Sequence, residues 1–274
     1  MSQYVESARL ALNDPTKKTL IHCWRGGKRS EAIQWLFNFS GIHSARLYGG
    51  YKSFRSALQS FFAQNNFDLK ILGGYTGSGK TEILNEISKN GQQVIDLEKL
   101  AHHKGSAFGS IGEEEQPTNE QFENNLFAAF TLIDITKPVW LENESRNIGK
   151  VYLPEAVWLK MRQSILYTIE VDREIRLDRA LKYYSTPVDV DLLKISFERI
   201  RKRLGGQEYQ NAIKAIDEGD LKTAASIALK YYDKSYTFQL HNWDPARVVH
   251  LKNCNEIKEA AMALIDATQV YTNQ

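Results

Sequence analysis

One stretch, ILGGYTGSGKTEI, constrains the fold of this chain more than any other. An apolar run over residues 67–74 predicts a β-strand, and residues 81–90 predict a helix that ends at Gly91. Between them stands the pattern G-x4-G-K-T, whose backbone amides wrap a chain of phosphates when a strand precedes it and a helix follows it. The predicted phosphate-binding loop comprises Gly74, Tyr75, Thr76, Gly77, Ser78, Gly79, Lys80 and Thr81.

Several polar side chains are candidates for contacts with the phosphates or with a metal ion beside this loop. Lys80 would reach the outer phosphate, and the Thr81 hydroxyl is a suitable ligand for Mg²⁺. A carboxylate that orients a metal or acts as a base usually ends a neighbouring strand. Glu142 is therefore the first candidate and Asp96 the second, although each also fits an ordinary polar strand end. Arg146 follows the strand that ends at Glu142 and is a candidate phosphate contact. The motif indicates a phosphate chain without naming a nucleotide, and the sequence alone assigns no metal site and no resident cofactor.

Segments with strand and helix patterns alternate along the chain, which predicts parallel sheets covered by helices, an α/β fold. A boundary is expected near residue 66, which divides the chain into domains 1–66 and 67–274. The C-terminal part is expected to be mostly helical until SYTFQLHNW at 235–243, before a closing helix. Expected strands cover residues 19–24, 45–50, 67–74, 92–98, 137–144 and 164–171.

Composition excludes several classes of protein. The chain has 274 residues, 42% of them hydrophobic and 25% charged, which is typical of a globular protein with a sizeable core. No apolar run approaches the roughly 20 residues that cross a bilayer, so no membrane association is expected. Two cysteines, Cys23 and Cys254, make neither a disulfide framework nor a metal knuckle, and a cytoplasmic location is expected.

A second short loop, in LIHCWRGGKRSEA, has the features of an anion site. Cys23 ends an apolar strand and the following loop opens a helix, so backbone N–H groups and the helix dipole point toward the sulfur or an anion beside it. Such a positive potential lowers the pKa of a thiol. The sequence therefore predicts a catalytic thiolate at Cys23, the alternative being an inert core cysteine. The predicted anion loop comprises Trp24, Arg25, Gly26, Gly27, Lys28, Arg29 and Ser30.

Two chemistries fit this second loop. The spacing H-C-x5-R-S is that of cysteine phosphatases, in which an arginine, here Arg29, closes on phosphate with two hydrogen bonds. The loop is also close to the active-site loop of rhodanese domains, which carry sulfur or selenium on a cysteine. A phosphatase favours a general acid from a separate loop, and no Asp-bearing partner loop stands beside this one.

Basic residues are unevenly distributed, although the formal net charge is only +2. Each of two basic clusters fits either a surface for nucleic acid or phosphorylated ligands or an ordinary solvated face. The first cluster comprises Lys17, Lys18, Arg25, Lys28, Arg29, Arg46, Lys52 and Arg55, and the second comprises Arg199, Arg201, Lys202 and Arg203.

Taken together, five motifs resemble those of the tRNA 2-selenouridine synthase family, in which a rhodanese domain is fused to a P-loop domain. They are CWRGGKRS, GYTGSGKT, DLEKLAHHKGSAFGSIG, QPTNEQFEN and LENESRNIGKVYLP. The resemblance runs from about residue 19 through most of the chain. It implies a partial rhodanese-like unit over residues 1–66, followed by a P-loop NTPase-like parallel α/β domain with a helical C-terminal part. One departure is Asn143, where the family pattern has an acidic residue.

The resemblance also implies an activity. Family enzymes act on 2-thiouridine at the wobble position of certain bacterial tRNAs, so the anticodon region of tRNA is the expected partner. They transfer a geranyl group from geranyl diphosphate to the sulfur, and then exchange the alkylated sulfur for selenium from selenophosphate. The loop at 74–81 would bind the diphosphate of the first step. The Cys23 loop would receive selenophosphate, or carry selenium, in the second.

A rhodanese domain normally has several strands and helices before its active-site strand, whereas 22 residues precede Cys23 here. The expectation is therefore a shortened N-terminus, or a separate polypeptide that supplies the missing part. Two other functions fit the sequence. One is a P-loop kinase or ATPase with a passive rhodanese remnant, and the other is a non-catalytic module that binds RNA or anions.

Overall fold

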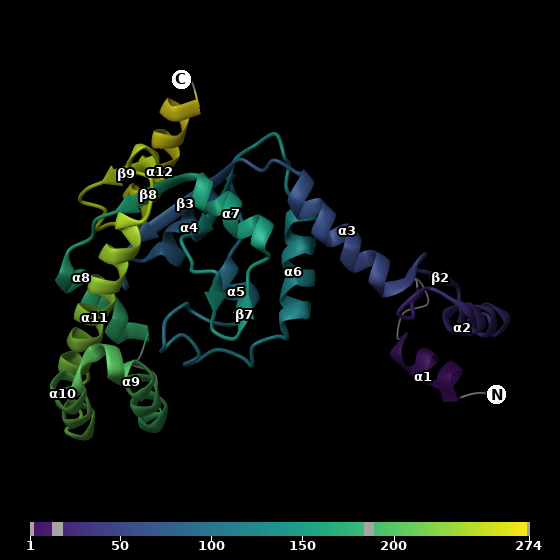
Figure 1. Ribbon diagram of the computed structural model, residues 1–274, viewed down its shortest axis with the longest axis horizontal. Helices are drawn as coiled ribbons and strands as arrows, with labels where there is room; N and C mark the ends of the chain where they lie inside the picture. Colours follow the sequence, from purple (N-terminus) through teal and green to yellow (C-terminus); the bar gives the residue numbers. More distant parts are fainter. Residues whose placement is uncertain (1–2, 13–18, 184–188, 273–274) are drawn as a thin grey trace. The chain divides into compact units, whose positions relative to one another are not determined.

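The computed structural model describes residues 3–12, 19–183 and 189–272 of the chain (Figure 1). It divides into two compact units, Met1–Asn65 and Asn66–Gln274. Lys17 and Lys18, which belong to the first basic cluster, lie outside the described residues.

The first unit is a small α/β unit with two short parallel strands. Its hydrophobic core consists of Val5, Ile21, Phe37 and Ile42, and two strands alone are marginal in water. The strands pair in register from Thr19 with Ser44 to Ile21 with Arg46. Its elements are α1 (Gln3–Ala11), β1 (Thr19–Ile21), α2 (Lys28–Phe39), β2 (Ser44–Arg46) and α3 (Gly50–Gln64).

The second unit is built on a five-stranded sheet with strand order β4-β5-β3-β8-β9, in which every pair is parallel. The strands are β3 (Leu69–Gly74), β4 (Gln93–Val94), β5 (Val139–Glu142), β8 (Ile165–Ile169) and β9 (Val248–Leu251). All residues of the central strand β3 are buried, as expected for a parallel sheet covered on both faces. The predicted α/β fold is confirmed.

Helices cover this sheet and extend beyond it. One side is packed by α4 and α12 through Ile83, Ile87, Ala261 and Leu264, which share a core with the strands. The helices are α4 (Lys80–Lys89), α5 (Leu97–Ala101), α6 (Asn119–Thr131), α7 (Glu155–Gln163), α8 (Arg173–Tyr183), α9 (Val190–Leu204), α10 (Gly206–Asp217), α11 (Leu221–His241) and α12 (Ile257–Thr272). A hairpin, β6 (Asn147–Ile148) with β7 (Val151–Tyr152), and a 3-10 turn, Pro245–Arg247, complete the unit.

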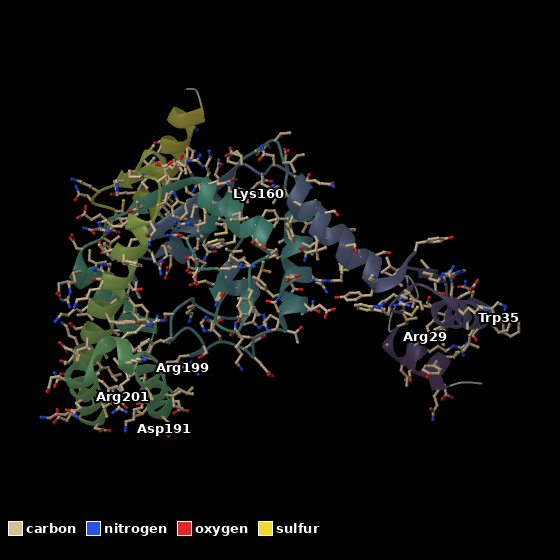
Figure 2. All side chains as sticks on the ribbon, in the orientation of Figure 1. Arg29, Trp35, Lys160, Asp191, Arg199 and Arg201 are labelled. Atoms are coloured by element: carbon tan, nitrogen blue, oxygen red, sulfur yellow. The ribbon has the colours of Figure 1, made fainter. Side chains whose placement is uncertain are left out.

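Helices α9, α10 and α11 gather at one end of this unit (Figure 1). They have a hydrophobic core of their own, in which Leu193, Phe197 and Ala224 pack with Phe108 from the loop between α5 and α6. Arg199 donates a hydrogen bond to the carbonyl of Ala107 in that loop, 3.3 Å away. The second basic cluster thus lies on α9, where Figure 2 labels two of its members. The predicted helical C-terminal part is present.

Several sequence expectations differ from the structure. The strands predicted over 19–24 and 45–50 end at Ile21 and Arg46. The strand predicted over 92–98 ends at Val94, because the Asp96 carboxylate accepts a hydrogen bond from Lys99 N at 2.8 Å and caps α5. The sequence predicts that the helical part stops before 235–243, whereas α11 continues to His241. Tertiary contacts of Tyr236 and Thr237 override the strand preference of their β-branched and aromatic neighbours.

No helix among the described residues is long and apolar enough to cross a membrane.

The packing of α12 against α4 gives a stability prediction. Leu264→Ala should lower the free energy of unfolding by about 2–5 kcal/mol, because it removes a fully buried side chain and leaves a cavity. Met262→Ala on the same helix is the matched control, since Met262 is 46% exposed and surface changes usually stay within about 0.5 kcal/mol. Urea unfolding of both variants measures the difference. Equal losses in the two variants would contradict the assigned packing.

Candidate functional site

Each unit carries one of the two predicted anion loops. The Cys23 loop (residues 23–30) lies in the first unit, where it follows β1 and includes the first turn of α2, and Gly27 is the residue before the helix starts. Cys23 Sγ lies 3.4 Å from Ser30 Oγ, and Ser30 Oγ also donates to the carbonyl of Gly27 at 2.9 Å. The hydroxyl has one proton, so it can turn from the carbonyl to the sulfur when the thiol ionises.

These contacts favour the thiolate form of Cys23. The hydrogen bond from Ser30, together with backbone N–H groups of Arg25, Gly27 and Ser30, lowers the Cys23 pKa to about 6, against the opposing effect of desolvation. Cys254 provides a contrast in the same chain, because burial raises the pKa of its thiol. These contacts favour ionisation of the Cys23 thiol near neutral pH, and a catalytic role for Cys23 stays a prediction.

A close contact between Gly26 of the Cys23 loop and Gly50, the first residue of α3, fixes the shape of this loop. Gly26 and Gly50 have φ values of +65° and +68°, and a Cβ on Gly50 would lie 2.3 Å from both the Cys23 carbonyl oxygen and the Gly26 nitrogen. The start of α3 also binds this loop, since Tyr51 N and Lys52 N donate to the carbonyls of Cys23 and Trp24 at 3.0 and 2.9 Å. Sequence reasoning missed Gly50, although the Gly49-Gly50 pair before a helix was a usable signal.

The Gly74 loop (residues 74–81) lies in the second unit, at the carboxyl end of the central strand. The chain adds β5 on one side of β3 and β8 on the other, and such a switch point is where parallel sheets bind ligands. Gly77 and Gly79 take positive φ values of 80° and 82°, which L-residues with a Cβ rarely adopt. Lys80 Nζ donates to the carbonyl of Gly74 at 3.3 Å, so the ammonium lies over the loop.

Two arginines from α8 bind backbone carbonyls of this loop, and no local sequence pattern predicts either of them. Arg176 is buried, pairs with both carboxylate oxygens of Asp233 at 2.8 and 2.9 Å, and donates to the carbonyl of Thr76 at 3.2 Å. Arg179 donates to the carbonyl of Ser78 at 2.7 Å. Both are positioning residues, because they bind carbonyls of the loop and leave its amides available.

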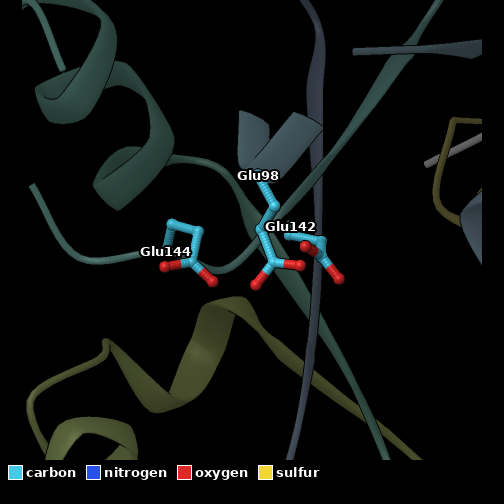
Figure 3. Close-up of side chains that lie close together, drawn as sticks. All are labelled: Glu98, Glu142 and Glu144. Carbon is cyan, nitrogen blue, oxygen red and sulfur yellow. The ribbon is translucent and has the colours of Figure 1, made fainter. Parts of the chain in front are cut away.

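Three carboxylates meet beside Thr81 (Figure 3). Thr81 Oγ1 donates to Glu142 Oε1 at 3.2 Å and lies 3.5 Å from Glu98 Oε2. One oxygen from each of Glu98, Glu142 and Glu144 lies within 4.8 Å of the others. These three residues are called the glutamate cluster below. Sequence reasoning selected Glu142 and missed its two partners, which lie on α5 and after β5.

The glutamate cluster has perturbed acidities. Burial, followed by the charge of Glu142, raises the pKa of Glu98 to about 10, and the same two causes raise the pKa of Glu144 to about 7. Burial also raises the pKa of Glu142, against the attraction of Lys80. Without a further positive charge, the cluster therefore retains protons near neutral pH.

Asp96 and Arg146, the other two residues predicted to act beside the Gly74 loop, do not belong to the glutamate cluster. Asp96 caps α5 and also borders the cavity beside the Gly74 loop. Arg146 lies 3.9 Å from the carboxylate of Glu155 and is not among the described residues that line this cavity. Asn143, which replaces an acidic residue of the family pattern, is followed by Glu144, and it is Glu144 that supplies the third carboxylate of the cluster.

The cavity has a volume of about 480 Å³ and two different walls, a size typical of ligand sites. The Gly74 loop and the glutamate cluster form the polar wall. Tyr236 lines the same cavity, and burial raises its pKa to about 12, so its hydroxyl keeps its proton. The apolar wall comes from the helical end of the unit and includes Phe108, Ile111, Leu193, Phe197, Ala228 and Leu229.

The sheet, the glycine-rich loop after its central strand and the cavity beside it define an α/β protein whose ligand site lies at the carboxyl ends of parallel strands. A family profile described as "tRNA 2-selenouridine synthase AAA domain" matches residues 67–266. The chain belongs to the tRNA 2-selenouridine synthase family, and the resemblance seen in its motifs is confirmed.

Individual relatives agree with the family match. A tRNA 2-selenouridine synthase from Sulfurovum sp. is 32% identical over 272 residues, which cover 87% of this chain and 72% of the relative. One from Hydrogenovibrio crunogenus is 34% identical over 254 residues, covering 81% of this chain and 69% of the relative. One from Nitrosomonas europaea is 37% identical over 179 residues, and there the match covers 62% of this chain and 46% of the relative. The rhodanese-like nature of residues 1–66 stays a prediction.

The Cys23 environment predicts a pH profile. Alkylation of Cys23 by iodoacetamide should show a midpoint near pH 6 and be lost as the pH falls below it, because the thiolate is the reacting form. Ser30→Ala should move this midpoint upward, since it removes the largest cause of the lowered pKa. Mass spectrometry of tryptic peptides follows both cysteines, and the buried Cys254 is the internal control. A midpoint near pH 9 in the chain without substitutions would show that the loop does not lower the pKa of Cys23.

Proposed function

We propose that this chain converts 2-thiouridine at the wobble position of tRNA to 2-selenouridine, through an S-geranyl intermediate formed with geranyl diphosphate. The observation that carries the proposal is a single cavity in which the Gly74 loop and an apolar wall lie together. Family membership supports the tRNA part of the proposal. The cavity supports the choice of a prenyl diphosphate over a nucleotide.

The polar wall has the donors that a diphosphate needs. Backbone amides of the Gly74 loop, the positive end of α4 and the Lys80 ammonium provide N–H groups and positive charge at one place. In the proposed first step, the thiocarbonyl sulfur of the base attacks C1 of the geranyl group. The C1–O bond breaks, and its electron pair leaves with the diphosphate. The base loses the N3 proton and becomes a neutral S-geranyl product.

The apolar wall of the cavity would bind the geranyl tail of the substrate. Aliphatic and aromatic side chains from α9 and α11 line the cavity together with Phe108, which comes from the loop between α5 and α6. Burial of each CH₂ group is favourable by about 0.8 kcal/mol, so a ten-carbon tail gains binding free energy there that a nucleotide with a polar ribose would not. This difference favours a prenyl transferase over a kinase or ATPase.

The Cys23 loop is the proposed site of the selenium donor. Its amides and the exposed Arg25, Lys28 and Arg29 are suited to the anion selenophosphate. In the second step selenium becomes bonded to C2 of the base and the C2–S bond breaks. Its electron pair leaves with the geranyl thiolate, which takes up a proton. Water hydrolyses the P–Se bond and phosphate is released. S-alkylation makes this exchange feasible, because a thiocarbonyl sulfur is a poor leaving group and an alkyl thiolate is a better one.

Mass spectrometry of tRNA nucleosides tests the proposal directly. Incubation with geranyl diphosphate alone should yield S-geranyl-2-thiouridine, and addition of selenophosphate should yield 2-selenouridine. Cys23→Ala should stop the second product and spare the first, whereas Lys80→Ala should stop the first. Rapid ATP or GTP hydrolysis without RNA, with no alkylated nucleoside, would overturn the proposal in favour of a kinase or ATPase.

A substitution in the apolar wall separates tail binding from diphosphate binding. Ala228→Trp should raise the Kd for geranyl diphosphate about tenfold, since excluding roughly two CH₂ groups costs about 1.6 kcal/mol. The Kd for pyrophosphate should stay unchanged, because the Gly74 loop is untouched. Ala128→Trp on α6, at an exposed position outside the cavity, is the matched control. Calorimetry measures both ligands, and an equal loss for both would show that the wall does not hold the tail.

A further inference from the structure

A second hollow lies along α8 and α11, and the chemistry proposed above does not use it. The two helices pack side by side (Figure 1), and an open groove of about 560 Å³ runs along them. It is lined by Arg173 from α8 and by six residues of α11 between Lys230 and His241. This α11 groove is separate from the cavity beside the Gly74 loop, because the two share no lining residue.

One side of α11 forms the groove and another side forms the cavity. Lys230, Lys234 and Phe238 are four residues apart, so they project from the same side of the helix. Tyr236 and Gln239 project from another side and line the cavity. A helix with its side chains is about 10 Å across, so the thickness of one helix separates the groove from the cavity.

The groove is positively charged. Arg173, Lys230 and Lys234 are exposed along it. Asp233 is the carboxylate that also lines the groove, but both its oxygens accept hydrogen bonds from the buried Arg176, at 2.8 and 2.9 Å. That internal ion pair neutralises Asp233, so the three exposed cations dominate the charge of the groove.

Two of these cations have acidic neighbours at the surface. Arg173 lies 3.8 Å from the carboxylate of Glu174, and Lys230 lies 3.5 Å from that of Glu208. Exposed ion pairs of this kind contribute only about 0–1 kcal/mol. A phosphate group can therefore take the place of either carboxylate.

Phe238 adds an aromatic ring to this charged surface. Its side chain is 71% exposed, one helical turn after Lys234, and no other phenylalanine among the described residues of the second unit is exposed. A single exposed apolar residue is ordinary, but a ring beside a row of cations is the combination that binds single-stranded nucleic acid. Cations follow the phosphates, and bases stack on the ring.

The groove is also connected to the Gly74 loop. The hydroxyl of Thr237, which lines the groove, lies 3.3 Å from the Tyr75 hydroxyl of that loop. On α8, Arg176 follows Arg173 by three residues and binds the carbonyl of Thr76. The helices that line the groove are thus the helices that hold the loop, and a strand bound in the groove lies close to it.

We infer that the α11 groove binds a single-stranded segment of RNA, with phosphates on its three cations and one base stacked on Phe238. A polyanion without bases would use the cations and leave the ring in water. The assignment of this RNA to the tRNA substrate, held while its wobble base reaches the cavity, rests on the proposed function. The affinity of the groove for RNA does not.

Fluorescence anisotropy with a labelled tRNA anticodon stem-loop and the full chain tests the cations. Lys230→Gln combined with Lys234→Gln should raise the Kd about tenfold or more. It should also reduce the slope of log Kd against log salt by about 1.4, since each phosphate contact to a single strand contributes about 0.7. Lys89→Gln combined with Lys137→Gln is the matched control, because both lysines are exposed, ion-paired and outside the groove. Equal Kd values and slopes in the two double variants would overturn the inference.

The same assay tests the ring. Phe238→Ala should raise the Kd about fivefold or more with an unchanged salt slope, because loss of one stacked base costs about 1 kcal/mol or more. Phe238→Tyr keeps the ring and should retain the affinity. Leu132→Ala is the matched control, at an apolar side chain that is 87% exposed and outside the groove.

Polyphosphate, a polyanion without bases, separates stacking from charge. It should bind Phe238→Ala like the chain without substitutions and bind the Lys230/Lys234 double variant more weakly. If Phe238→Ala weakens polyphosphate binding as much as RNA binding, the ring does not hold a base. If gel filtration shows that this substitution converts a dimer to a monomer, the groove is an interface between two copies of the chain. Either result overturns the inference.

Nucleoside mass spectrometry and calorimetry separate this inference from the proposed function. Geranyl diphosphate should bind all these variants equally, because none of the substituted residues lines the cavity. If the groove variants bind RNA like the chain without substitutions while that chain alkylates tRNA, the proposed function stands and the inference falls. If they lose RNA binding but the chain without substitutions forms no S-geranyl nucleoside, the RNA surface stands and the proposed function falls.

Discussion

The Gly74 loop depends on the buried ion pair between Arg176 and Asp233. This pair joins α8 to α11, and from it Arg176 reaches the carbonyl of Thr76 while Arg179 binds that of Ser78. A loop that binds an anion must turn its N–H groups toward the ligand and its carbonyl oxygens elsewhere. The two arginines provide that second condition, because they donate hydrogen bonds to the carbonyls of Thr76 and Ser78 and are not among the described residues that line the cavity. The sheet determines the position of the loop at the end of β3, and the two arginines determine the direction of its peptide dipoles.

Charge is organised in layers around the same loop. Arg176 and Arg179 bind backbone carbonyls of the loop, Lys80 donates to the carbonyl of Gly74, and three carboxylates lie together beside Thr81. The helical end of the same unit is apolar instead, because its aliphatic and aromatic side chains line the cavity. A ligand with a highly charged head and an apolar tail matches this gradient. The Cys23 loop uses a different device, in which backbone amides and one hydroxyl stabilise a thiolate.

The parts of both sites that could be predicted from the sequence are contiguous in it. GYTGSGKT and CWRGGKRS carry their own strand and helix context, and Glu142 is found because it ends a strand. The parts that could not be predicted are distant in the chain. Arg176 lies 100 residues from Thr76, and Glu98 is separated from Glu142 by a loop, a helix and a strand. Only pairing of the strands brings such residues together, and a single sequence does not contain that information.

Helix α11 shows the same limit for secondary structure. Its last two turns contain aromatic and β-branched residues that locally favour a strand. In the fold, however, Asp233 holds Arg176, Thr237 lies 3.3 Å from the Tyr75 hydroxyl, and Tyr236 borders the cavity. These contacts require the helical spacing of 3.6 residues per turn, so this segment forms a helix and not a strand.

The backbone contact between Gly26 and Gly50 has a consequence for protein evolution and engineering. Neither position has room for a methyl group. Any other amino acid at Gly26 or at Gly50 would therefore force the two backbone segments apart. Random mutagenesis will therefore find both sites intolerant, although neither has a side chain that takes part in chemistry. Homologous sequences that retain the cysteine but have lost one of these glycines would be expected to carry a rebuilt turn.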